Sequence, residues 1–192
     1  MMKHTWILLT GLILTGCLGG RSTPPQFYTL NTTVCTAPHP AAAATVALTR
    51  VQVPRALDRP QMVVFDATRP EAQVSEMNRW LEPLPNLINQ AMIADLSACL
   101  PNAVVKKRTT AQEQFDYFLS LEITQLTVVP GQSATLDGWA MIRRSSGQLV
   151  ARLRLNDSVP VGATYADAAA AQSTLLGRAA TTIAARIADL KP

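Results

Sequence analysis

The sequence predicts an α+β domain, an α/β sandwich in which two main helices pack on one face of a mostly antiparallel sheet. Three observations support this prediction. Several segments alternate apolar and polar residues, as half-buried strands do. Two segments, 84–100 and 165–190, repeat apolar residues at helical spacing instead. The run Ser145–Gly147 joins two of the predicted strands as a hairpin loop, which makes those strands antiparallel.

Strands are predicted where β-branched and aromatic residues are concentrated. The clearest runs from Phe115 to Val129, where apolar residues alternate with Asp116, Ser120 and Glu122. A strand over 45–53 alternates in the same way and ends at Pro54. The other predicted strands are a short run at 27–30, then 61–66, a short segment at 73–75, a strand starting at 104–105, 134–144 and 148–155.

The first predicted helix spans Leu84–Leu100, with Pro83 and Pro85 in a first turn that tolerates proline and Pro101 at its end. The second spans Tyr165–Leu190 and is rich in alanine. Its apolar stripe could pack on the sheet, which we favour, or seed a coiled coil. The stripe consists of Leu176, Ala180, Ile183, Ile187 and Leu190.

The N-terminus carries a membrane-targeting signal. A basic start at Lys3 precedes the apolar run Trp6–Leu14, which is far shorter than the ~20 residues of a spanning helix. The next residues complete Leu14-Thr15-Gly16-Cys17, which resembles the lipobox of bacterial lipoproteins. That resemblance implies cleavage after residue 16, then a diacylglycerol and an N-acyl chain on Cys17. Leu18, rather than Asp, implies sorting to the outer membrane.

The chain therefore divides into a signal peptide over 1–16, a lipidated flexible tether over 17–26 and a single domain over 27–192. The tether is rich in Gly, Ser and Pro, which do not bury enough apolar area to fold alone. The chain carries 17 basic and 13 acidic residues, a net charge of +4 without a dense basic block. This mild charge does not indicate nucleic-acid binding.

Two cysteines, Cys35 and Cys99, remain beside Cys17 in an oxidising compartment. We expect them to form a disulfide, with two buried free thiols as the alternative. A metal site is disfavoured because His4 and His39 are the chain's only histidines, and His4 belongs to the signal.

Motifs of catalysis do not appear in the sequence, which lacks nucleophile-elbow, phosphate-loop and zinc-binding patterns. Asp116 and Glu122 could share a strand face as paired carboxylates, but exposed strand carboxylates are the ordinary explanation. We therefore expect no enzyme activity, and no cofactor beyond the covalent lipid.

Two segments are candidate binding elements. The first is the charged loop bounded by Pro54 and Pro60, and the second is the segment before the first helix. An exposed arginine and leucine on a rigid loop suit a partner interface, whereas the alternative is a solvated connection. A tryptophan at the second position serves either an interface or a lid on the core. The predicted interface residues are Leu57, Asp58, Arg59, Arg79 and Trp80.

The order of these pieces resembles the PqiC/YmbA family of ABC-type transport auxiliary lipoproteins. The resemblance rests on the lipobox followed by Phe27–Leu30, Leu57–Val63 and Arg79–Leu84, then strands and a C-terminal helix. It implies an outer-membrane lipoprotein on the periplasmic side, with a sheet and two helices. Cys35, Cys99 and the alanine-rich run 41–44 are not part of the family pattern.

The family's partners are MCE-domain proteins of the PqiB type, which form a tube or ring across the periplasm for lipid traffic. The leading hypothesis is therefore a non-enzymatic docking subunit that supports membrane integrity, for which a homo-oligomeric ring is plausible. The alternatives are a periplasmic lipid-binding carrier and an accessory lipoprotein of another envelope assembly machine.

Overall fold

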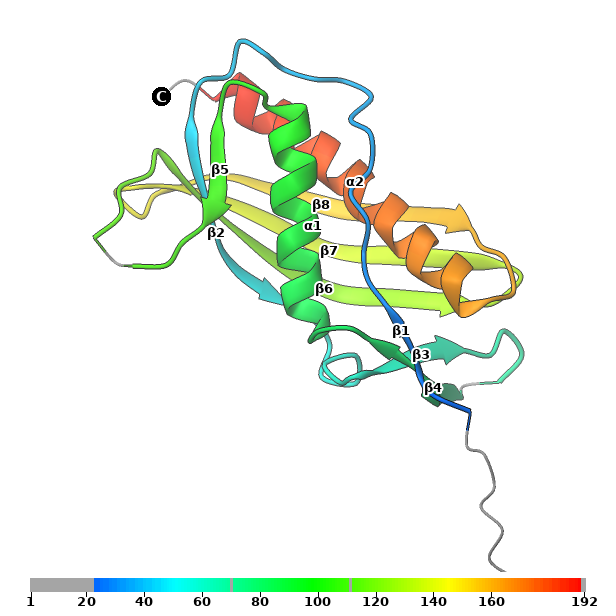
Figure 1. Cartoon of the computed structure of the whole chain (residues 1–192). Coiled ribbons are helices and arrows are strands. Elements are labelled where there is room, and N and C mark those ends of the chain that lie inside the picture. Colours follow the sequence, from blue (N-terminus) through cyan, green and yellow to red (C-terminus); the bar gives the residue numbers. More distant parts are fainter. Residues whose placement is uncertain (1–22, 70, 111, 191–192) are drawn as a thin grey trace, which may run out of the picture.

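The computed structural model describes residues 23–69, 71–110 and 112–190 and confirms the α+β class (Figure 1). The predicted signal peptide and most of the predicted tether lie outside these residues. The elements in chain order are β1 (Gln26–Tyr28), β2 (Thr45–Gln52), β3 (Gln61–Phe65), β4 (Ala72–Trp80), α1 (Leu84–Cys99), β5 (Val104–Lys107), β6 (Tyr117–Val129), β7 (Ser133–Arg144), β8 (Leu149–Pro160) and α2 (Tyr165–Asp189).

The strands divide into two mixed sheets. The smaller has the order β1-β4-β3 and the larger β5-β2-β6-β7-β8. β6, β7 and β8 form a long antiparallel meander, whereas β2 pairs in parallel with both β5 and β6, and β1 pairs in parallel with β4. Both helices lie on the same side of the five-stranded sheet (Figure 1). The core fills the space between the helices and this sheet, with Leu96, Leu119 and Ile183 fully buried.

Two strands are longer than the sequence predicts. β4 covers Ala72–Trp80 rather than a short segment, because several of its residues face solvent and its pairing with β3 contains a register shift, so the apolar alternation is obscured. β8 continues to Pro160 through Asn156–Ser158, which are poor strand formers. β8 is an edge strand, where proline is tolerated because one side needs no ladder hydrogen bond.

The helix predictions agree with the structure to within a residue at each end. α2 begins with a capping box in which Thr164 Oγ1 accepts a hydrogen bond from the Asp167 backbone N–H at 3.1 Å, and the Thr164 N–H donates to Asp167 Oδ2 at 3.0 Å. The α2 stripe is buried against the sheet and α1, apart from half-buried Leu190, so packing on the sheet is the alternative that holds.

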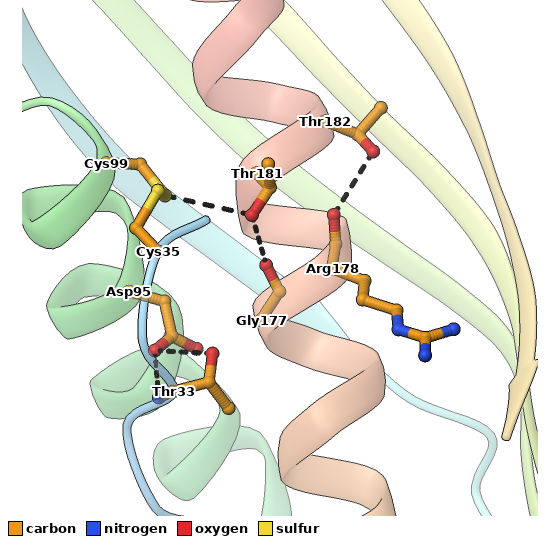
Figure 2. The surroundings of a disulfide bond; sticks show 8 residues. All are labelled: Thr33, Cys35, Asp95, Cys99, Gly177, Arg178, Thr181 and Thr182. Carbon is orange, nitrogen blue, oxygen red and sulfur yellow. Dashed lines mark hydrogen bonds between the residues drawn. A yellow bond between two sulfur atoms is a disulfide. The ribbon is translucent and has the colours of Figure 1, made fainter. Parts of the chain in front are cut away.

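Residues 29–36 form a strap that contacts both helices. The Asn31 backbone N–H donates to Ser173 Oγ of α2 at 3.0 Å. The Thr33 backbone N–H donates to Asp95 Oδ1 of α1 at 2.6 Å (Figure 2). Further along, Cys35 and Cys99 are joined in a disulfide. The strap therefore ties the N-terminal strand to the helical layer at three points.

The buried carboxylate of Asp95 makes the strap sensitive to pH. Burial raises its pKa above the ordinary value of 3.8, although hydrogen bonds from Thr33 act in the opposite direction. Because ionisation is disfavoured in the folded state, Asp95 costs stability as the pH rises above 3.8. We expect Asp95→Asn, which stays neutral and keeps an acceptor for Thr33, to melt at a higher temperature than the wild type at pH 7.

The measurement is thermal unfolding followed by circular dichroism at pH 7 and pH 3. At pH 3, below the ordinary pKa of 3.8, the carboxyl group is mostly protonated in both the folded and the unfolded chain, so the difference in melting temperature should shrink to little or nothing. A difference of the same size at both pH values would show that the substitution acts through packing rather than through charge.

Candidate docking surface

The five-stranded sheet has an outer face, which is the face turned away from α1 and α2. Register identifies its residues, because directly opposed residues of antiparallel strands point to the same side. Trp139 of β7 lies opposite Glu122 of β6 and Arg154 of β8, and its neighbours Gly138 and Ala140 are buried on the helical side. Asp157 of β8 marks the other face, since it accepts a hydrogen bond from Arg178 of α2 at 3.1 Å.

Cationic and aromatic side chains stack on this outer face. The Arg152 guanidinium lies 3.9 Å from the centroid of the Trp139 ring, and that of Arg154 lies 5.2 Å from it. The Arg108 guanidinium, which follows β5, lies 4.9 Å from the centroid of Phe118 on β6. Such contacts attract the guanidinium charge to the face of the ring. Tryptophan and arginine are also the residues most enriched among energetic hot spots of protein interfaces.

One arginine of the cluster is fixed by an ion pair. Arg154 Nε donates to Asp137 Oδ1 at 2.9 Å, and Asn156 adds a hydrogen bond to the same carboxylate at 3.2 Å. The hydrogen bonds from Arg154 lower the pKa of Asp137 below its usual value, so the carboxylate stays ionised at neutral pH. The charge of Arg154 is therefore partly neutralised by Asp137. Arg152, in contrast, forms no ion pair with any of the residues that the structure describes.

At one end the outer face is hollowed into a pocket of about 960 Å³. The loop before β6 and the β7–β8 hairpin form its walls, and Phe118 and Arg143 line it. Most of the other lining residues are polar or charged. This composition suits contact with a polar surface rather than storage of an acyl chain, which requires an apolar lining.

The structure divides the predicted interface residues into two groups. Asp58 and Arg59 are exposed, and Arg79 is half-buried. Leu57 and Trp80 are only 6% and 5% exposed and belong to the core, so the expectation of an exposed leucine is wrong. The Trp80 backbone N–H donates to Pro60 O at 2.7 Å, so the proline-bounded loop and the segment before α1 lie side by side. The side chains of Leu57 and Trp80 nevertheless point inward. Trp80 therefore serves as the lid on the core.

The other candidate residues have structural roles. Asp116 accepts hydrogen bonds from the Thr45 backbone N–H and hydroxyl, both at 2.7 Å, and these lower its pKa. It fixes the start of β2 against β6, while Glu122 stays exposed. His39 lies beside the disulfide, where its backbone N–H donates to Cys99 O at 2.7 Å. Within residues 23–69, 71–110 and 112–190 no cluster of His, Cys, Asp and Glu could hold a metal ion.

The described helices include none that is both long enough and apolar enough to cross a membrane. Cys17 lies outside the described residues, so its lipidation stays a prediction.

The chain belongs to the family of ABC-type transport auxiliary lipoprotein components, whose model matches residues 28–184. Membership makes the chain an auxiliary lipoprotein component of transport, associated with the cell envelope. No curated protein matches the sequence.

Two crystal structures share the fold. An uncharacterized protein is 17% identical with a TM-score of 0.70, covering 86% of this chain and 99% of its own. The protein XCC0632 from Xanthomonas campestris is 21% identical with a TM-score of 0.67, covering 83% of this chain and 92% of its own.

Sequence reasoning missed the Trp139 cluster, although one signal was available. Leu136, Ala140 and Ile142 place the apolar side of β7 toward the helices, so alternation puts Trp139 on the polar side. A large aromatic residue on a polar strand face is unusual enough to mark a candidate surface. The stacking by Arg152 depends on the β7–β8 register and could not be read from the pattern alone.

Proposed function

We propose that this protein is a non-enzymatic docking subunit, anchored by lipid at the periplasmic face of the outer membrane. Its partner would be an MCE-domain protein of the PqiB type in an intermembrane lipid transport system. Family membership supports the auxiliary role in transport, and the resemblance of the ordered sequence segments supports the MCE partner.

The observation that carries the docking role is the stack of Arg152 and Arg154 on Trp139. These side chains are already held in place by ring and ion-pair contacts, so a partner that binds them pays little conformational entropy. Leu57 and Trp80, the two apolar residues of the predicted interface, are buried and cannot contact a partner at the surface. The outer sheet face, in contrast, combines an aromatic ring with cations and an adjoining pocket.

The test is affinity purification of the acylated full-length protein from mild-detergent envelopes, with mass spectrometry of the proteins that accompany it. We expect an MCE-domain protein at stoichiometric level. Trp139→Ala should weaken its capture by about 30-fold, the effect of removing an interface hot spot of about 2 kcal/mol. Val34→Ala is the control, because Val34 is an exposed apolar residue of the strap on the helical side.

Each outcome has a distinct meaning. Trp139→Ala could leave capture of the MCE-domain protein at the wild-type level while Arg59→Glu abolishes it. That result would assign the interface to the residues predicted from the sequence. Absence of any MCE-domain protein, together with bound lipid in native mass spectra, would favour the periplasmic lipid carrier. Co-purification of a different envelope machine would identify an accessory lipoprotein of that machine.

A further inference from the structure

The three-stranded sheet exposes apolar side chains on its outward face. Phe27 of β1 lies beside Arg79 of β4 in the parallel register, and Met77 and Leu81 flank Arg79 at alternate positions. The Leu81 backbone N–H bonds to Tyr28 O at 2.8 Å, so the pairing continues past the end of β4. Phe27, Met77 and Leu81 are 58%, 41% and 62% exposed. Together with Arg59 and Arg79 they form what we term the anchor-end surface.

Charges accompany this apolar group. Arg79 Nη2 lies 3.0 Å from Glu76 Oε2, and Gln61 donates to the same carboxylate. Hydrogen bonds from Gln61 and Arg79 lower the pKa of Glu76, and the positive charge of Arg59 acts in the same direction. Exposed apolar side chains next to the two arginines, Arg59 and the ion-paired Arg79, suit the boundary between acyl chains and phosphates at a bilayer surface.

The anchor-end surface contains β1, the strand that follows the predicted lipid-bearing Cys17 most closely along the chain. β1 begins at Gln26, nine residues after the predicted lipid-bearing Cys17. Nine residues span at most about 30 Å when fully extended. A domain of this size has a radius of gyration of about 15 Å, hence a diameter near 40 Å. The predicted anchor is thus too short for the domain to move its full width away, and it keeps the end containing β1 within about 30 Å of the lipid.

We propose that the anchor-end surface rests on the phospholipid surface in which the lipid anchor is embedded. Phe27, Met77 and Leu81 would enter the interfacial region, and Arg59 and Arg79 would face lipid phosphates. The acyl chains and this face then act together as two linked contacts, which fixes the orientation of the domain. The inference depends on the lipid anchor of the proposed function but not on its MCE partner.

The test places a tryptophan reporter at the surface. Leu81→Trp is introduced into the acylated full-length protein, which is reconstituted into vesicles of phosphatidylethanolamine and phosphatidylglycerol containing bromine-labelled lipids. Leu149→Trp is the matched control, since Leu149 is also an exposed leucine (44%) but lies at the β7–β8 hairpin, away from the three-stranded sheet (Figure 1). Wild-type protein supplies the background from Trp80 and Trp139.

We expect bromolipid to quench the added fluorescence of Leu81→Trp at least twofold more than that of Leu149→Trp. Equal quenching at both positions would overturn the proposal. The proposal would also be overturned if Leu81→Trp were shielded from the quencher acrylamide only after the MCE-domain protein is added. Shielding only at protein concentrations that promote self-association would overturn it as well. The first would assign the surface to the partner and the second to another copy of this chain. Because the vesicles contain no partner, failure of MCE capture leaves this result unaffected.

Discussion

Removing the Cys35–Cys99 disulfide is expected to lower the free energy of unfolding by about 4 kcal/mol, according to the chain-entropy relation. The bond joins residues 64 positions apart, so it closes a loop that contains β2, β3, β4 and α1, which ends at Cys99. It also ties the strap to α1, beside the contact of Thr33 with Asp95 (Figure 2). For a domain of this size the loss corresponds to a melting temperature about 8–16 °C lower.

The measurement compares denaturant unfolding of the wild type with that of Cys35→Ala/Cys99→Ala, each with and without reductant. Reductant should lower the stability of the wild type and leave the double variant unchanged. If the oxidised wild type and the double variant unfold at the same denaturant concentration, the disulfide does not constrain the unfolded chain. Reduced wild type that is much more stable than the double variant would instead assign the effect to lost packing around Cys99, which is buried.

Gly138→Ala is expected to cost about 2 kcal/mol of stability, within the usual range for overpacking of a filled site. A Cβ at this position would lie 2.4 Å from Glu122 O and 3.0 Å from Ile123 Cα, and both atoms belong to the backbone of β6. The β6–β7 pairing shifts register immediately after Ile123, so this close approach accompanies a bulge. The alanine can be accommodated only if β6 and β7 move apart.

Gly177→Ala in α2 provides the comparison. Its Cβ would lie 1.7 Å from Thr33 Oγ1, but that atom belongs to a side chain on the strap, which can move more easily than a sheet backbone. Alanine also favours the helix by about 1 kcal/mol over glycine. Chemical denaturation should therefore show a smaller loss for Gly177→Ala than for Gly138→Ala. The reverse order would contradict the role of the bulge.

Much of the fold could be predicted because its signals are local. The helical repeat with Pro83 and Pro101 defined α1, and alternation defined β2, β6 and β7. β4 was underestimated because its register shift and its exposed polar residues obscure the alternation. The division into two sheets, and the parallel pairing of β2 with β5 and β6, could not be predicted. Those pairings join segments far apart in the chain, and no local pattern encodes them.

The sequence by itself determined the class of fold, the two helices, the lipobox and the segments that identify the family. Each of these depends on neighbouring residues or on their order. Only the tertiary structure decided which side chains reach the surface. Leu57 and Trp80 turn into the core, while Phe27 and Leu81 stay exposed at the three-stranded sheet. Stacking of Arg152 on Trp139 likewise depends on cross-strand register, which long-range hydrogen bonding fixes only in the folded chain.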